Sequence, residues 1–442
     1  MMTFFLLIIL VYLGNKAIKN PSSFIIIITL SYVTLTLFQI GKNLYIVSIL
    51  SVVVLCLIVR RWRESRTVFV NFPFKFAFVL CLSSYLLSYV LHGVITPAII
   101  PSFIYDIKEY VFVVMAWMVT YKNADKNFFK SFMVAYMFIL CIYGLNEALN
   151  GDNIYIDYLQ ARGELGDDLY ENDNIIRTGF HRTKSLTIWC ESYGMICSIS
   201  LFVILNYILK KQLNFSLYWG VLICLLIFGV YSTNSRTCLV TMVIMLLSLL
   251  LYFKSNKKGI FVVFVLFSLG IYYSYEALGN VIDSIININD TTGSSLDMRL
   301  YQLISTLSYI SSDYVFGAGP TAVGSAMDSD NDIYGAESVI FTTLLRRGFW
   351  GLFTLFFLWI NILLYILKKK DYWLLPLVIG FYFLKTATLL YGVGESYILL
   401  FVFLLMGFSN LETDNLETEK QVINNQIIDN NRIRINNENS LV

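Results

Sequence analysis

Arg236 and Arg299 are the residues whose type and position most clearly indicate chemistry. Arg236 lies in the polar stretch 232–237 beside an apolar run, where a charge is tolerated only next to water, a partner or an anionic ligand. Arg299 is the only Lys or Arg between residues 280 and 337. A guanidinium can fork onto phosphate oxygens, so both residues are candidates for binding an anion. The competing interpretations are a cation that reaches the membrane surface for Arg236 and an ion pair with Asp297 or another acid for Arg299.

Arg346 and Arg347 end a second stretch of interest, which begins at Glu337. Residues 338–345 are part-apolar and too short to span a bilayer, which indicates a half-helix before a span that starts near Gly348. The two arginines would then face protein or a wet cavity in the membrane region. A substrate contact and an ion pair with Glu337 or another acid explain them about equally well.

Arg177 and Arg182 belong to a basic cluster directly before another apolar run. Such a cluster at a lipid surface is either a topological anchor or a contact for an anionic ligand. Glu191 lies some six residues into the predicted span that follows, where burying a charge is costly. It is therefore either a ligand contact or a carboxyl group kept neutral or hydrogen-bonded to a neighbouring helix. Other charges predicted inside spans are Glu276, Lys385, Lys108 and Glu109.

Several chemistries lack the residues that they need. The acidic stretch 328–332 has Ile333 where a calcium loop requires glycine. The chain has 2 His, and its 7 Cys lie in apolar runs without the paired spacing of zinc ligands. No Gly-rich phosphate loop followed by Lys-Ser or Lys-Thr occurs. We therefore expect no metal and no cofactor, and the balance of 32 basic against 30 acidic residues indicates no nucleic-acid partner.

The elements that must position these residues are predicted to be membrane helices. The 442-residue chain is 57% hydrophobic and 14% charged, with a mean hydropathy of +0.68, far from the averages of soluble proteins. We expect an all-α polytopic membrane protein with about 12–13 transmembrane helices. The candidate spans lie near 1–15, 23–41, 44–59, 74–95, 103–121, 128–149, 185–208, 215–232, 236–253, 259–279, 348–367, 372–391 and 395–409.

The distribution of Lys and Arg predicts the topology. Basic residues fill every second connection between spans, and the positive-inside rule makes those connections cytoplasmic. The N-terminus is then outside, as a first span rather than a removable signal, and the C-terminus is cytoplasmic. The transmembrane domain covers 1–410, with two long acidic outer loops, 150–184 and 280–337. Residues 411–442 form an Asn-rich polar tail that is expected inside the cell.

Taken together, these motifs resemble the Wzy-type O-antigen polymerases and O-antigen ligases of bacterial surface-polysaccharide assembly. The resemblance covers about 170–370 in detail and the whole chain in hydropathy. It is carried by the following stretches in this order: 177–180 before a span, 234–237 at the start of a span, Arg299 early in a large outer loop, 316–320 after it, and 337–351 leading into the next span.

The resemblance implies a substrate and a set of roles. Members of this family transfer oligosaccharides from undecaprenyl diphosphate to a new acceptor hydroxyl. Arg236 and Arg299 would stabilise the departing diphosphate, with Arg346, Arg347, Arg177, Arg182 and Glu191 as substrate-binding candidates. Glu337 would take the proton of the acceptor, with Glu191 or Asp297 as other candidate bases and a helix cap as the competing role for Glu337.

The reaction favoured by the resemblance is polymerisation of repeat units on the outer face of the bacterial inner membrane. Glu337 stands where a histidine is often expected in ligases, which favours a polymerase, a membrane glycosyltransferase, over a ligase acting on lipid A-core. A flippase is the second alternative, although such transporters more typically show internal repeats and short loops. The lipid bilayer and a chain-length regulator are the expected partners besides the lipid-linked oligosaccharide.

Overall fold

The computed structural model describes residues 70, 72–92, 126–161, 181–187, 190–209, 216–252, 296–322 and 338–387. Within these ranges all regular secondary structure is helical, which confirms the predicted helical class as far as the described residues reach. The elements are α5 (Lys75–Leu91), α7 (Lys126–Asn150), α8 (Ile154–Ala161), α10 (Cys190–Leu209), α11 (Leu217–Ser232), α12 (Arg236–Tyr252), α14 (Leu296–Tyr309), α16 (Val339–Lys369), the 3-10 helix η3 (Tyr372–Leu374) and α17 (Leu375–Ala387).

Most of these helices coincide with predicted spans. The spans near 74–95, 128–149, 185–208, 215–232, 236–253, 348–367 and 372–391 correspond to α5, α7, α10, α11, α12, the later part of α16, and α17. In the described part of the chain, α10 and α16 are long and apolar enough to cross a membrane. The remaining predicted spans, 1–15, 23–41, 44–59, 103–121, 259–279 and 395–409, lie outside the described residues, as does the tail 411–442.

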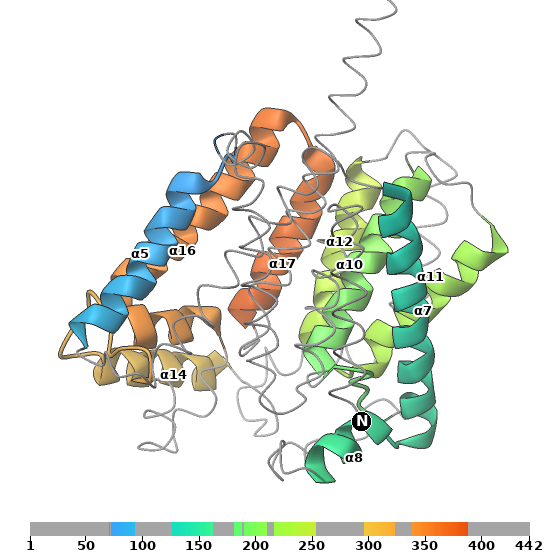
Figure 1. The fold of residues 1–442 in the computed structure, drawn as a ribbon, viewed down its shortest axis with the longest axis horizontal. Helices are drawn as coiled ribbons and strands as arrows, with labels where there is room; N and C mark the ends of the chain where they lie inside the picture. Colours follow the sequence, from blue (N-terminus) through green and yellow to red (C-terminus); the bar gives the residue numbers. More distant parts are fainter. Residues whose placement is uncertain are drawn as a thin grey trace, which may run out of the picture.

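The helices form two groups joined by α17 (Figure 1). In one group α10 packs against α11 and α12, and α7 packs against α11. In the other group α5 lies along α16, and α14 packs across the end of α16 where that helix begins. Helix α17 contacts both α12 and α16. The candidate residues of the sequence therefore fall into two regions on either side of α17.

The exposed surface of α16 is apolar. Phe349, Phe353, Ile360 and Leu364 are each about half exposed, and their spacing of four or seven residues places them along one side of the helix. A continuous apolar surface of this kind is typical of a helix that faces lipid or a partner. Together with the apolar helices α10 and α16, it indicates a membrane protein.

The described parts of both long loops lie at the same end of the bundle. Helix α8, in loop 150–184, and helix α14, in loop 280–337, both appear at the lower end in Figure 1. The charge pattern of the sequence requires such an arrangement, because it assigns both loops to one face of the membrane. Which face this is stays a prediction.

Candidate functional site

A short segment, residues 181–187, crosses the end of the α7–α12 group; we call it the strap. Its central residues Thr183, Lys184 and Ser185 are buried. The backbone N–H of Thr183 donates to the carbonyl oxygen of Ser232 at 2.9 Å. The strap therefore joins the end of the first long loop to the turn between α11 and α12, although 49 positions separate the two partners in the chain.

Arg182 of the strap forms an ion pair with Glu191 in the first turn of α10. Arg182 Nη2 lies 2.8 Å from Glu191 Oε1, and the two side chains are 21% and 19% exposed. The thiol of Cys190 donates to Glu191 Oε2 at 3.0 Å. The two side chains of the pair are thus partly exposed to solvent.

Glu191 lies nearer its helix start than the sequence indicated. Helix α10 begins at Cys190 rather than near 185, so Glu191 is in the first helical turn and not six residues inside. The cause is the strap, in which Ser185 has a left-handed backbone (φ 55°) that a helix cannot continue through. A carboxylate in the first turn of a helix is favoured by the helix dipole.

The turn that precedes Arg236 is polar and buried. Ser232, Thr233, Asn234 and Ser235 are each at most 5% exposed. Asn234 adopts a left-handed conformation (φ 53°), which asparagine tolerates better than most residues. Helix α12 then begins at Arg236. The positive end of a helix dipole disfavours a cation, so an arginine at this position needs a counter-charge or water beside it.

Glu147, near the end of α7, is a residue of this region that sequence reasoning missed. It is 4% exposed, and its Oε2 accepts from the backbone N–H groups of Lys184 at 3.1 Å and Ser185 at 2.6 Å. The only signal in the sequence is an acid within the apolar run 140–149. Glu147 lies near the end of the predicted span 128–149, and its backbone partners 37 and 38 positions away are not visible in the sequence.

The second region is the break in α16 at Gly348, which confirms the predicted half-helix before a span. The half-helix begins after Ser338, whose hydroxyl oxygen accepts from Ile340 N at 3.2 Å. Gly348 has φ 61° and ψ −159°, a conformation essentially restricted to glycine. Beyond it the helix continues to Lys369.

The stretch 314–318 completes the hydrogen bonds at this break. The N–H groups of Phe349 and Trp350 donate to the carbonyls of Tyr314 and Val315, both at 2.9 Å. In the other direction, Ala318 N donates to Leu345 O at 2.7 Å. A break in a helix leaves such backbone groups without their usual partners, and the loop supplies replacements.

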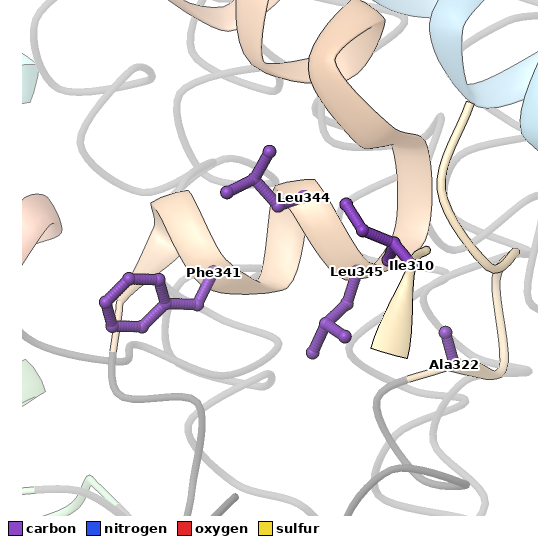
Figure 2. Close-up of a cluster of buried hydrophobic side chains, with 5 residues drawn as sticks. All are labelled: Ile310, Ala322, Phe341, Leu344 and Leu345. Atoms are coloured by element: carbon purple, nitrogen blue, oxygen red, sulfur yellow. The ribbon is translucent and has the colours of Figure 1, made fainter. Parts of the chain in front are cut away.

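The position of Gly317 in the 316–320 motif requires a glycine. It has φ 77°, and a Cβ atom there would lie 2.6 Å from the backbone nitrogen of Gly348. The two backbones therefore meet at a distance that no side chain permits. Behind this contact, Ile310, Ala322, Phe341, Leu344 and Leu345 form a buried cluster that holds the loop on the half-helix (Figure 2).

Arg347 is buried beside α5. It is 3% exposed, and its guanidinium donates to the hydroxyls of Ser84 at 3.1 Å and Thr343 at 3.3 Å. It also lies over the ring of Tyr85, 3.9 Å from the ring centre, within cation–π range. These contacts join the half-helix to α5. The roles that the sequence suggested for Arg347, a substrate contact or an ion pair with an acid, stay predictions. Arg346 is half-buried, and its carbonyl accepts from Ser88.

The structure brings some predicted site residues together and leaves others outside its description. Arg182, Glu191 and the start of α12 at Arg236 belong to one region, and Arg346 and Arg347 belong to the other. Arg299 lies in the first turn of α14, which packs on α16. Glu337, Arg177, Glu276, Lys108 and Glu109 lie outside the described residues.

Among the described residues, no group of three or more His, Cys, Asp or Glu side chains is arranged to hold a metal ion. The candidate ligand-binding residues of this region are arginines. Two predicted site arginines, Arg236 and Arg299, lie in the first turns of helices, where backbone N–H groups and the helix dipole also favour anions. The arrangement suits a polyanionic ligand.

Fold and site thus describe a helical membrane protein with anion-binding potential at one end. Comparison with protein families is consistent with this class. Residues 219–356 match the model of the O-Antigen ligase family, a range that contains Arg236, Arg299, Arg346 and Arg347. The match confirms the resemblance noted in the sequence and supports a role in polysaccharide assembly. No curated protein matches the chain significantly.

Proposed function

We propose that this protein polymerises oligosaccharide repeat units carried on undecaprenyl diphosphate, on the outer face of the cytoplasmic membrane. The observation that carries the proposal is the convergence of two cation-bearing segments within one end of the bundle. The strap, with Arg182, is hydrogen-bonded to the turn from which Arg236 opens α12. A lipid-linked diphosphate is a polyanion at the membrane surface, and arginine suits its oxygens in charge and shape.

In the proposed reaction, a hydroxyl oxygen of one glycan attacks the anomeric carbon of another. A new glycosidic C–O bond forms as the C–O bond to the diphosphate breaks, and the lipid diphosphate leaves with the electron pair. The hydroxyl proton passes to a base, for which Glu337 is our candidate. Arg236 and Arg299 stabilise the charge that develops on the leaving group.

The remaining candidates take supporting roles in this proposal. Arg182 and Arg346 are partly accessible and are assigned to substrate binding, as is Arg177. Glu191 orients Arg182 through the ion pair. Arg347 is buried against α5 and is assigned to positioning of the half-helix rather than to the diphosphate itself.

Deletion of the gene tests the reaction class. The surface polysaccharide of the deletion strain should run on a gel as cores capped by a single repeat unit instead of a ladder. An unchanged ladder would exclude a role as polymerase. Complementation with Arg236→Ala or Arg299→Ala should fail to restore the ladder at normal protein level, and lysine at either position should restore it only partly, because a point charge cannot fork.

Glu337→Gln tests the base separately from the arginines. Glutamine keeps the size and much of the capping ability of the carboxylate but removes its basicity. Loss of polymer at normal protein level would support the base. Near-normal polymer would leave Glu337 as a helix cap and direct attention to Glu191 or Asp297.

A ligase is the second candidate function, because the matching family model is described as O-Antigen ligase. A ligase transfers completed polymer to an acceptor such as lipid A-core. The same deletion separates the two reactions. Without a ligase, surface polymer is lost completely while lipid-linked polymer of full length accumulates. Without a polymerase, only single repeats remain on either carrier.

A further inference from the structure

The side chain of Glu147 binds the backbone of the strap. The carboxylate of Glu147 accepts two consecutive backbone N–H groups, of Lys184 and Ser185, in a chain segment whose left-handed Ser185 turns both donors toward one acceptor. Asn153 adds a second connection, because its Nδ2 donates to Ser185 O at 2.9 Å. The hydroxyl of Ser185 donates to Leu140 O at 2.7 Å. All of these partners are buried.

These bonds fix the segment that carries Arg182. On one side of Thr183 the strap is attached to Glu147, and at Thr183 itself it is attached to Ser232. Arg182 is the neighbouring residue, and its guanidinium reaches Glu191 at 2.8 Å. A side chain on a loop is only as well placed as the backbone that bears it.

We propose that Glu147 is a positioning residue of the anion site: its carboxylate fixes the strap so that Arg182 stays at Glu191, beside the turn that opens α12 at Arg236. This inference rests on the proposed function for the role of Arg182. Glu147 itself does not touch the substrate. It is 4% exposed, and one of its oxygens is committed to the strap backbone, so it acts through the backbone and not on the sugar.

A labelling experiment tests the positioning without reference to activity. His181 begins the strap and packs against Gly151, so a cysteine at 181 reports whether the strap is seated. The full-length protein with His181→Cys is purified in detergent, reacted with a maleimide, and the peptide carrying residue 181 is quantified by mass spectrometry. The same peptide of the parent chain, which has no cysteine at 181, provides the blank.

Glu147→Leu removes the acceptor and should raise the labelling rate at 181 by about tenfold or more, as expected when both hydrogen bonds to the strap backbone are lost. Glu147→Gln keeps an oxygen that can accept from both N–H groups, so its rate should stay close to that of the His181→Cys protein with Glu147 intact. Asp157→Asn is the matched control, since Asp157 is an exposed acid at the same end of the bundle. Equal labelling at 181 in the His181→Cys protein with and without Glu147→Leu would overturn the proposal.

Polymer synthesis then connects positioning to function. Glu147→Leu should reduce polymer strongly at normal protein level, and Glu147→Gln should restore much of it. If Glu147 acts through Arg182, the double variant Glu147→Leu, Arg182→Ala should be no worse than Arg182→Ala alone. Additive losses, or a Glu147→Gln variant as inactive as Glu147→Leu, would contradict positioning.

The two experiments separate the failure of this inference from failure of the proposed function. If Arg182→Ala makes normal polymer, Arg182 has no role in the reaction, and that part of the proposed function fails while the labelling result still stands. If Arg182→Ala is inactive and Glu147→Leu is fully active, the anion site stands and Glu147 does not position it.

Discussion

Two arginines, Arg182 and Arg347, occupy opposite kinds of environment in this molecule. Arg182 is 21% exposed and pairs with a carboxylate on a neighbouring helix. Arg347 is 3% exposed and contacts two hydroxyls and an aromatic ring. Arg182 belongs to the strap, which precedes α10, and Arg347 directly precedes the break in α16 at Gly348. In the sequence they have equal standing as candidate substrate contacts.

The difference shows how a structural cation differs from one available for a ligand. A buried guanidinium that contacts two hydroxyls and an aromatic ring has its position fixed by packing. A partly exposed guanidinium that is paired with a carboxylate can exchange this partner for an anionic ligand. The exchange does not require a buried side chain to move into solvent. This contrast supports the proposed division of roles, in which the region of Arg182 and Arg236 binds the anion and Arg347 holds the half-helix.

Exchange of the Arg182 and Glu191 charges should have the largest effect. Arg182→Glu should reduce polymer synthesis about 10²- to 10³-fold, because it removes a cation from the site and adds an anion. The double variant Arg182→Glu, Glu191→Arg restores an ion pair of opposite direction and should restore protein level but not polymer. Recovery of polymer by the exchanged pair would show that the bridge is purely structural and would remove the contrast with Arg347.

Gly348→Ala should destabilise the protein by about 3 kcal/mol, since its backbone conformation is accessible essentially to glycine alone. The added methyl group would also fall on the Val315 carbonyl. Thermal unfolding in detergent measures the effect. Gly380→Ala, a glycine within α17 whose Cβ would meet only side chains, is the comparison and should lose less. Equal losses would mean that the break is not specially constrained.

Arg347→Ala should cost about 2 kcal/mol of stability, because it empties a buried space and leaves the hydroxyls of Ser84 and Thr343 without this donor. Polymer made per folded molecule should change little compared with Arg182→Glu. Lysine at 347 should not restore the stability fully, since it cannot fork between the two hydroxyls. A normal melting temperature with abolished polymer would transfer Arg347 to the ligand-binding group.

Asp313→Ala should have the smallest effect, about 1 kcal/mol. The Oδ1 of Asp313 accepts from the N–H groups of Val315 at 3.0 Å and Phe316 at 2.9 Å, which shapes the stretch that docks on Gly348. Asp313→Asn retains an acceptor and should unfold close to the native temperature. If alanine and asparagine are equally harmful, the negative charge and not the turn is what matters at 313.

Hydropathy and the polar residues between apolar stretches predicted local features of this fold, such as the start of α12 and the break in α16. The predicted span and helix α12 both begin at Arg236, because the polar run 232–235 separates two apolar stretches. The break at Gly348 was predictable since the apolar stretch before it is too short to span. These features depend on neighbours in the chain, which a sequence shows directly.

Features set by distant partners could not be predicted in this way. The late start of α10 depends on Glu147 binding Lys184 and Ser185, partners 37 and 38 positions away. The role of Arg347 depends on Ser84, 263 positions away. Polarity alone identified Arg182 and Glu191 as candidates, but their pairing follows from the seating of the strap, which hydropathy does not encode.

The backbone bonds across the break at Gly348 also determine how force passes through the molecule. Residues 314–318 supply backbone hydrogen-bond partners to Phe349, Trp350 and Leu345. The end of the loop and α16 are therefore joined rigidly and not through a hinge. A load applied to α14 would be carried along α16 into its contacts with α5 and α17. The end of the loop and α16 would therefore tilt together.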